Sequence, residues 1–176
     1  VQTLYDINKS SSLQNYILRH NLDRTTKELR RSFVKTCASN CVLGYILGLG
    51  DRNLCNILVK TNGVMVHIDY SYIFGDDPKK LETEMRITPG MLDMLGGTDQ
   101  PEYEQLKVLT TSMFCQIRKY TFFWYPFLKL ICTIHPPTNY YGKIQNLIEH
   151  VERRMMPNAT FNEINVAIVD LSLIHI

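Results

Sequence analysis

Two short stretches of the chain carry the residues best suited to chemistry. Asp51 and Asn56 lie five residues apart in the first stretch, and Asp69 ends a short apolar run in the second. Magnesium prefers hard oxygen ligands and usually takes one or two carboxylates together with phosphate oxygens. Phosphoryl transfer needs such ligands and a group that orients the attacking hydroxyl. We therefore expect Asn56 and Asp69 to bind magnesium and Asp51 to face the nucleophile.

A β-hairpin is predicted to bring these residues together. Residues 57–60 and 64–68 are two short β-rich runs, and Asn62-Gly63 between them accepts the positive φ of a tight turn. The polar residues of the first stretch precede the first strand, and Asp69 follows the second strand. Taken singly, either aspartate is better explained as a turn residue. Because both aspartates are expected at the same end of one hairpin, we favour a functional role for them over turn formation alone.

The rest of the chain is expected to be mainly helical, which gives the fold class α+β. Residues 2–7 are predicted to be extended and residues 69–88 to form a loop. Gly44 and Gly48 are costly inside a helix, so they indicate either the close approach of another backbone or a helix end near Gly48. The helix after Pro101 is expected to break at Pro126. Helical patterns and capping signals cover residues 13–20, 26–48, 89–96, 101–134, 140–155 and a last helix that begins at a Thr160–Glu163 capping box.

Composition limits the class of protein. A chain of 176 residues can bury one sizeable core, and a net charge of +2 gives no basis for a nucleic-acid partner. Five cysteines without paired spacing predict reduced thiols in an intracellular protein. The most apolar window, residues 122–134, is too short to span a bilayer.

The aromatic run over residues 122–127 has two interpretations. Aromatic side chains flanked by Lys119 and Lys129 suit a membrane interface. Six consecutive apolar positions suit burial on both sides of a helix. We favour core packing against the helix over residues 26–48.

The two chemical stretches resemble those of a known family. Gly50-Asp51-Arg52, Asn56 and the His67-Ile68-Asp69-Tyr70 run are similar to the catalytic loop and metal-binding motif of phosphatidylinositol 3- and 4-kinases. The similarity runs from Ser12 to Leu171, and the Gly75–Lys79 loop most resembles class III phosphatidylinositol 3-kinases. It implies a protein-kinase-like fold whose mostly helical C-lobe carries both loops on a small hairpin.

The resemblance also implies a domain assignment. Residues 1–171 would be the C-lobe of the catalytic domain, and the N-lobe, with its phosphate loop and strand lysine, would precede this sequence. This chain alone is then expected not to turn over ATP. Residues 172–176 resemble a translated sequencing adapter and are expected to be a non-native tail, which begins at Leu171 if the scar overlaps the last helix.

The family's functional positions map onto three groups of residues. The catalytic positions would be Asp51, Arg52 and Asn53. Asn56 and Asp69 would hold Mg²⁺, or Mn²⁺, together with ATP. Lys79, Lys80 and Arg86 in the activation loop would meet the inositol phosphate, with solvent exposure as the alternative.

Several positions depart from the family pattern. Asn53 stands where the family has a histidine, and an amide cannot act as the general base that is typically worth about 10²–10⁴ in rate. Tyr70 and Ser71 replace the family's phenylalanine and glycine, and Cys55 replaces a frequent aspartate. Metal binding is therefore more secure than turnover. A pseudokinase that serves as a binding or scaffold module is the main alternative, and a related protein kinase is the third.

The implied activity is that of a transferase. A lipid kinase would move the γ-phosphate of ATP to the inositol ring of phosphatidylinositol, at the 3-hydroxyl, in phosphoinositide signalling and membrane trafficking. The few basic residues suit phosphatidylinositol better than more highly phosphorylated lipids. The expected location is the cytoplasm, peripheral on intracellular membranes. Regulatory subunits remain open as partners, and no nucleic acid is expected.

Overall fold

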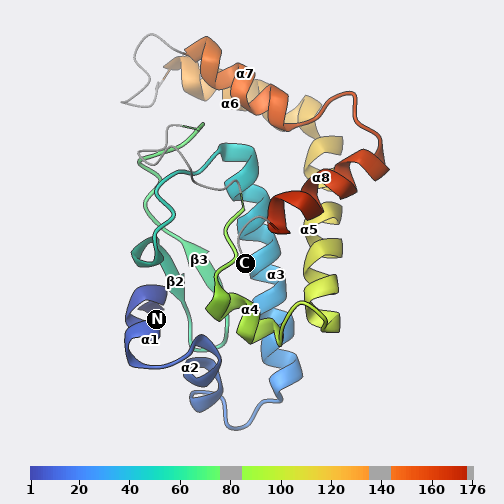
Figure 1. The fold of residues 1–176 in the computed structure, drawn as a ribbon. Helices are drawn as coiled ribbons and strands as arrows, with labels where there is room; N and C mark the ends of the chain where they lie inside the picture. Colours follow the sequence, from blue (N-terminus) through green and yellow to red (C-terminus); the bar gives the residue numbers. More distant parts are fainter. Residues whose placement is uncertain (76–84, 135–143, 174–176) are drawn as a thin grey trace.

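Helices surround a small antiparallel sheet in the computed structural model, which describes residues 1–75, 85–134 and 144–173 (Figure 1). The α+β class is therefore confirmed. The elements are β1 (Gln2–Thr3), α1 (Leu4–Ser10), α2 (Leu13–Arg19), α3 (Thr26–Leu47), the 3₁₀ helix η1 (Leu54–Asn56), β2 (Ile57–Val59), β3 (Met65–His67), α4 (Pro89–Leu95), α5 (Pro101–Lys119), α6 (Thr121–Ile134), α7 (Ile144–Arg154) and α8 (Phe161–Leu173).

The predicted hairpin is present. β2 pairs antiparallel with β3, with Ile57 opposite His67, and β1 adds the third strand on the other side of β2. Gly63 closes the turn at φ +84°. Residues 4–7, expected to be extended, instead lie in α1, because the Thr3 side chain accepts a hydrogen bond from the Asp6 backbone N–H and begins the helix.

The long helix α3 packs against β3 on one side and α5 on another, and its buried face forms much of the core. A capping box of Thr25 and Glu28 starts it, and Gly48 ends it in the left-handed conformation at φ +54°. The helix-end interpretation was therefore right. Close backbone approach was also right at Gly48, where a Cβ would lie 2.6 Å from the Gly75 backbone nitrogen, and wrong at Gly44, where a Cβ would meet nothing within 4 Å.

Local capping signals predicted three further helix starts correctly, those of α2, α4 and α8. Ser12 caps α2 and Thr88 caps α4, each through its side-chain oxygen. Thr160 and Glu163 form the reciprocal capping box of α8. That helix continues to Leu173, into the segment expected as a tail, whose origin stays a prediction. Residues 135–143, with the expected linker, lie outside the described ranges.

The break between α5 and α6 lies at Tyr120 and not at Pro126. Tyr120 leaves the helical conformation, and its N–H bonds the Ile117 carbonyl in a tightened last turn. The Thr121 hydroxyl and the Trp124 indole then satisfy the carbonyls of Arg118 and Ile117. These side chains cap the C-terminal end of α5, and α6 continues through Pro126.

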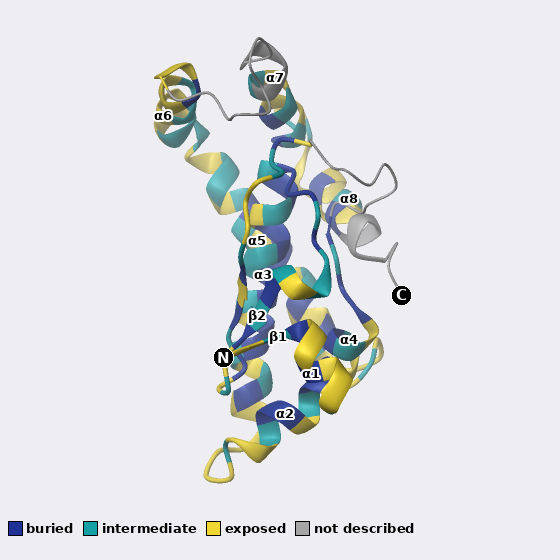
Figure 2. Cartoon of the chain, turned by 90° about the vertical axis from the view of Figure 1, so that its left-hand side faces the viewer, coloured by how far each residue is buried: buried dark blue, intermediate teal, exposed yellow. Residues whose placement is uncertain are grey.

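The aromatic run is mostly exposed, so the predicted core packing was wrong. Phe122, Phe123 and Phe127 are 76%, 64% and 56% exposed. Trp124 and Tyr125 are only partly buried. Figure 2 colours several parts of α6 as exposed. The reason is that α6 contacts α5 and α7 along one side, which leaves the opposite side of this apolar helix uncovered by the described chain.

All five cysteines are free thiols, as the sequence predicted. None of the described helices is both long enough and apolar enough to cross a membrane.

Candidate active site

The hairpin brings the predicted site residues to one end of the sheet. Asn56 ends η1, and its carbonyl accepts a hydrogen bond from the Ile68 N–H at 3.0 Å, just beyond the paired strands. The Asn56 side-chain Nδ2 donates to the Asp51 carbonyl at 2.8 Å and to its Oδ2 at 3.3 Å. Asp69 follows Ile68 directly. The geometry expected from the hairpin is therefore present.

Both aspartates lie in the left-handed region of backbone space. Asp51 has φ +47° and Asp69 has φ +59°. Asp and Asn are among the few residues other than glycine that visit this region readily. Each of these residues is thus a turn former and a carboxylate at the same time.

Arg52 joins the loops that carry these aspartates. The residue is only 5% exposed, and its Nε donates to the Gly50 carbonyl at 2.8 Å. Its two terminal nitrogens donate to the carbonyls of Ile68, at 2.8 Å, and Asp69. The guanidinium therefore fixes the first loop to the second and contacts backbone atoms.

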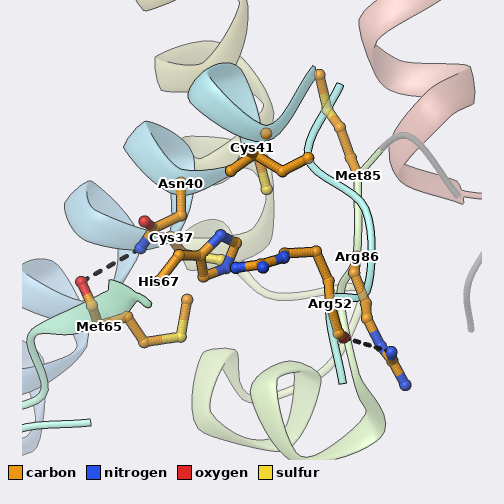
Figure 3. A pocket seen from close by; sticks show the side chains of 10 residues that line it. Cys37, Asn40, Cys41, Arg52, Met65, His67, Met85 and Arg86 are labelled. Atoms are coloured by element: carbon orange, nitrogen blue, oxygen red, sulfur yellow. Dashed lines mark hydrogen bonds between the residues drawn. The ribbon is translucent and has the colours of Figure 1, made fainter. Parts of the chain in front are cut away.

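His67 lies buried beside the Arg52 guanidinium (Figure 3). Burial, and secondarily the charge of Arg52, lowers the pKa of His67 to about 4. The imidazole is therefore neutral near pH 7. Its Nδ1 has no hydrogen-bond partner among the described residues. Met65 and His67 share the buried face of β3, and the two-residue period of the predicted strand was the sequence signal that could have indicated this position for His67.

Asn53 shapes the first loop from within. Its Oδ1 accepts hydrogen bonds from the backbone N–H groups of Cys55 at 2.9 Å and Asn56 at 3.2 Å, which caps η1. Its Nδ2 donates to both carboxylate oxygens of Asp51 at 3.2 Å. The residue thus holds the loop and orients the acid.

Asp69 presents an exposed carboxylate. The Ser71 hydroxyl donates to Asp69 Oδ1 at 2.6 Å and the Ser71 N–H donates at 3.1 Å. These two hydrogen bonds, and then the charge of Arg52, lower the pKa of Asp69 below its usual value. The side chain is therefore anionic at neutral pH.

The oxygens at this end of the hairpin fit a divalent cation of the Mg²⁺ type. Asp69 offers a charged carboxylate, and Asn56 donates through Nδ2, which leaves its Oδ1 as a ligand atom. No cluster of three or more His, Cys, Asp or Glu side chains that could hold a metal occurs within the described ranges. Two protein oxygens suit Mg²⁺, which usually completes its shell with phosphate oxygens and water.

The basic residues expected to meet substrate have different placements. Lys79 and Lys80 lie outside the described residues. Arg86 is half-buried and donates through a terminal nitrogen to the Arg52 carbonyl. It thus contacts the first loop, a neighbour that the sequence did not indicate.

Backbone hydrogen bonds join the segment that precedes Asp51 to the segment that follows Asp69. We call residues 47–50 and 72–75 together the loop junction. Gly50 N–H donates to the Tyr72 carbonyl at 2.9 Å, Phe74 N–H to the Leu47 carbonyl, and Gly75 N–H to the Gly48 carbonyl at 3.0 Å. The segment before Asp51 and the segment after Asp69 therefore run side by side.

Comparison with known proteins agrees with this geometry. The pattern of the family described as phosphatidylinositol 3- and 4-kinase matches residues 5–159. A phosphatidylinositol 3-kinase of Schizosaccharomyces pombe is 39% identical over 88 residues, which are 50% of this chain and 11% of that protein. The phosphatidylinositol 3-kinase VPS34 of Saccharomyces cerevisiae is 42% identical over 76 residues, 43% of this chain and 9% of the yeast protein.

The matches to these two relatives cover only 11% and 9% of their lengths. The family pattern spans most of this chain, from α1 to the segment between α7 and α8. The residues that carried the sequence resemblance all lie inside it. The chain belongs to the phosphatidylinositol 3- and 4-kinase family.

Proposed function

We propose that this chain is the C-terminal lobe of a protein-kinase-like catalytic domain, residues 1–171, in a phosphatidylinositol 3-kinase. The reaction transfers the γ-phosphate of ATP to the 3-hydroxyl of the inositol ring of phosphatidylinositol. The observation that carries this proposal is the meeting of Asp51, Asn56 and Asp69 at one end of the β2–β3 hairpin. The names of the similar fungal kinases support the choice of lipid.

Asp51 orients the attacking hydroxyl and takes up its proton in this proposal. Its carboxylate accepts hydrogen bonds from the amides of Asn53 and Asn56, which set its direction. An aspartate that accepts the substrate proton is the usual arrangement in protein kinases. Asn53 supplies no base, so the carboxylate acts without the family's histidine.

Asn56 and Asp69 would hold Mg²⁺ or Mn²⁺ through their side-chain oxygens. The bound metal neutralises charge on the phosphates of ATP. The lowered pKa of Asp69 keeps this ligand ionised. Arg52 holds the loop of Asp51 and Asn56 against the loop of Asp69 through its three hydrogen bonds to carbonyls. Its part is therefore to position these residues.

Phosphatidylinositol lies in a membrane surface, so the enzyme would act as a peripheral protein on intracellular membranes, from the cytoplasm. Lys79 and Lys80 are proposed to meet the lipid phosphate from the activation loop. Arg86 is proposed to support the first loop, because it already contacts the Arg52 carbonyl. Regulatory subunits are compatible with this function.

A lipid kinase assay tests the proposal. The complete protein that contains this chain should convert phosphatidylinositol in vesicles to the 3-phosphate with ATP and Mg²⁺. Asp69→Asn should lower kcat by on the order of 10²-fold or more, since it removes the charged metal ligand. Asp23→Asn, at an exposed position between α2 and α3, is the matched control.

Each other outcome has a distinct meaning. Lipid phosphorylation by Asn53→His alone would make the natural protein a pseudokinase. Labelling of a peptide in place of lipid would make it a protein kinase. An absence of product from the wild type and from Asn53→His would reject the catalytic proposal.

A further inference from the structure

Helix α7 packs against the loop junction at the C-terminal end of α3 (Figure 1). The contact is made by His150. A Cβ placed on Gly75 would lie 2.7 Å from Cε1 and 2.9 Å from Nδ1 of His150, and a Cβ placed on Gly48 would collide with Nε2. The imidazole therefore fills the space beside Gly75, and together with the Gly75 backbone nitrogen it fills the space beside Gly48.

The remainder of α7 is anchored independently of His150. The Arg154 guanidinium donates to the Tyr45 carbonyl at 2.6 Å and lies 4.9 Å from the centre of the Tyr45 ring. Val151 is fully buried and Met155 is 4% exposed in the core. The helix therefore stays in place through these residues, and the His150 ring lies on Gly48 and Gly75 of the junction.

His150 contacts the loop junction by van der Waals packing. Its Nε2 is buried and has no hydrogen-bond partner among the described residues. Burial, followed by the charges of Arg154 and Arg153, lowers the pKa of His150 to about 4, so the ring is neutral near pH 7. The Nε2 side of this neutral ring therefore contacts its neighbours by packing and not through a hydrogen bond among the described residues.

The junction needs such packing because the backbone of its two segments is weakly constrained. Gly48 and Gly75 both have positive φ, and glycine has the largest conformational freedom of any residue. The three backbone hydrogen bonds restrict the backbone of these glycines only while their donors and acceptors stay aligned. A ring packed against both glycines restricts their movement.

We propose that His150 is a positioning residue for the reaction, which rests on the proposed kinase function. It holds the loop junction closed and thereby fixes the distance between Asp51, just after the first segment of the junction, and Asp69, just before the second. A displacement of about 1 Å in reacting groups can cost about 10²-fold in rate. In this proposal His150 acts on the aspartates through Gly48 and Gly75, on which its ring lies.

The first test is the kinetics of His150→Ala in the complete protein. The expected result is a kcat at least about 10-fold lower, with the KM for ATP and for phosphatidylinositol changed less than about twofold. Arg153→Ala, on the exposed side of the same helix, should keep the wild-type kcat. An unchanged kcat in His150→Ala would overturn the proposal, as would a loss confined to KM.

A double-mutant cycle tests the contact itself. Gly75→Ala puts a methyl group against the His150 ring, so its effect on kcat should be larger in the wild type than in the His150→Ala background. The strain of positive φ is the same in both backgrounds. Gly63→Ala, which also has positive φ but lies in the hairpin turn, should be additive with His150→Ala. Additivity for Gly75→Ala would overturn the proposal.

Hydrogen exchange separates this inference from the proposed function. His150→Ala should speed exchange of the amide protons of Gly50, Phe74 and Gly75, which form the junction. This readout needs no catalysis, so it applies even if the wild type phosphorylates no lipid. Unchanged exchange at all three amides would reject the positioning role, whatever the lipid assay shows.

Discussion

The side-chain amide of Asn53 donates to both carboxylate oxygens of Asp51, at Nδ2–O distances of 3.2 Å. The same side chain caps η1 through its oxygen. A residue that cannot act as a base therefore still has a defined part in the site, because it fixes the direction of the acid. At the position where the resemblance implies a histidine, Asn53 holds the loop and the acid through hydrogen bonds.

Replacement of Asn53 by histidine should raise turnover. An imidazole at this place adds a general base, so Asn53→His is expected to increase kcat on phosphatidylinositol by about 10²-fold. Steady-state lipid phosphorylation measures the change. Asn53→Gln is the control, since a longer amide disturbs the cap and adds no base, and its kcat should fall. An unchanged kcat in Asn53→His would contradict this prediction and show that a base at position 53 adds nothing to proton uptake by Asp51.

Removal of the Ser71 hydroxyl should change the pH dependence of metal-dependent activity. The two hydrogen bonds from Ser71 are the main reason that the pKa of Asp69 is lowered, and Ser71→Ala removes one of them. The pKa of Asp69 then rises, so the carboxylate protonates at higher pH and the acid limb of activity moves upward. Ser71→Thr keeps the hydroxyl and should keep the wild-type profile. Coincident acid limbs for all three proteins would contradict this account.

Buried neutral histidine should make the fold sensitive to mild acid. The pKa of His67 is about 4 in the folded state, against 6.5 unfolded, so the unfolded state binds more protons between these values. Stability is thus fully present above about pH 6.5 and declines as pH falls toward 4. The expected loss from this group is about 2 kcal/mol at pH 5.

Urea unfolding at neutral and acid pH measures this loss. His67→Gln cannot take up the proton and should show a shallower decline, and His150→Gln should do the same, because its folded pKa is also about 4. The double variant should be the least sensitive of the three. A decline as steep as that of the wild type in the double variant would place the acid sensitivity elsewhere.

Arg52→Lys should destabilise the protein in spite of its retained charge. The guanidinium bonds three carbonyls from fixed directions, and a lysine ammonium cannot reproduce that fork. Carbonyls left without donors cost about 1–3 kcal/mol each when buried, so we expect a loss of about 2–3 kcal/mol. Thermal and urea unfolding measure it. Arg31→Lys, on the exposed side of α3, should change stability by less than about 0.5 kcal/mol.

Pro126→Ala should stabilise helix α6. Proline inside a helix removes one backbone hydrogen bond and costs up to about 3 kcal/mol relative to alanine, so a gain of about 1–2 kcal/mol is expected at this position near the first turns. The melting temperature should rise accordingly. Pro157→Ala, outside any helix, serves as the control. A lower melting temperature would mean that the proline shapes a contact that the helix needs.

The features that the sequence predicted well depend on neighbours in the chain. The Asn62-Gly63 turn, the Gly48 helix end and the Thr160–Glu163 capping box each need only a few adjacent residues, and each is present. The placement of Asp69 at the same end of the sheet as Asp51 and Asn56 followed from the same hairpin. Short-range chemistry determined most of the candidate site.

The features that it missed depend on contacts between distant segments. Phe122 and Phe127 lie on a helix that packs by one side only, and an apolar run does not reveal how many sides will be covered. The cap at Tyr120 competes with a proline break six residues later, and side-chain hydrogen bonds decide between them. The packing of His150 on Gly75 joins residues 75 positions apart, for which no local pattern exists.

The positive φ angles of Asp51 and Asp69 determine how mutagenesis of this site must be interpreted. Alanine is strained in the left-handed region, so an alanine scan would add a conformational penalty of about 1 kcal/mol to the loss of a carboxylate. Asparagine tolerates that backbone and removes only the charge. Glycine removes the side chain and releases the backbone. Comparison of the three substitutions at each aspartate separates charge, side chain and conformation, which a single alanine variant would confound.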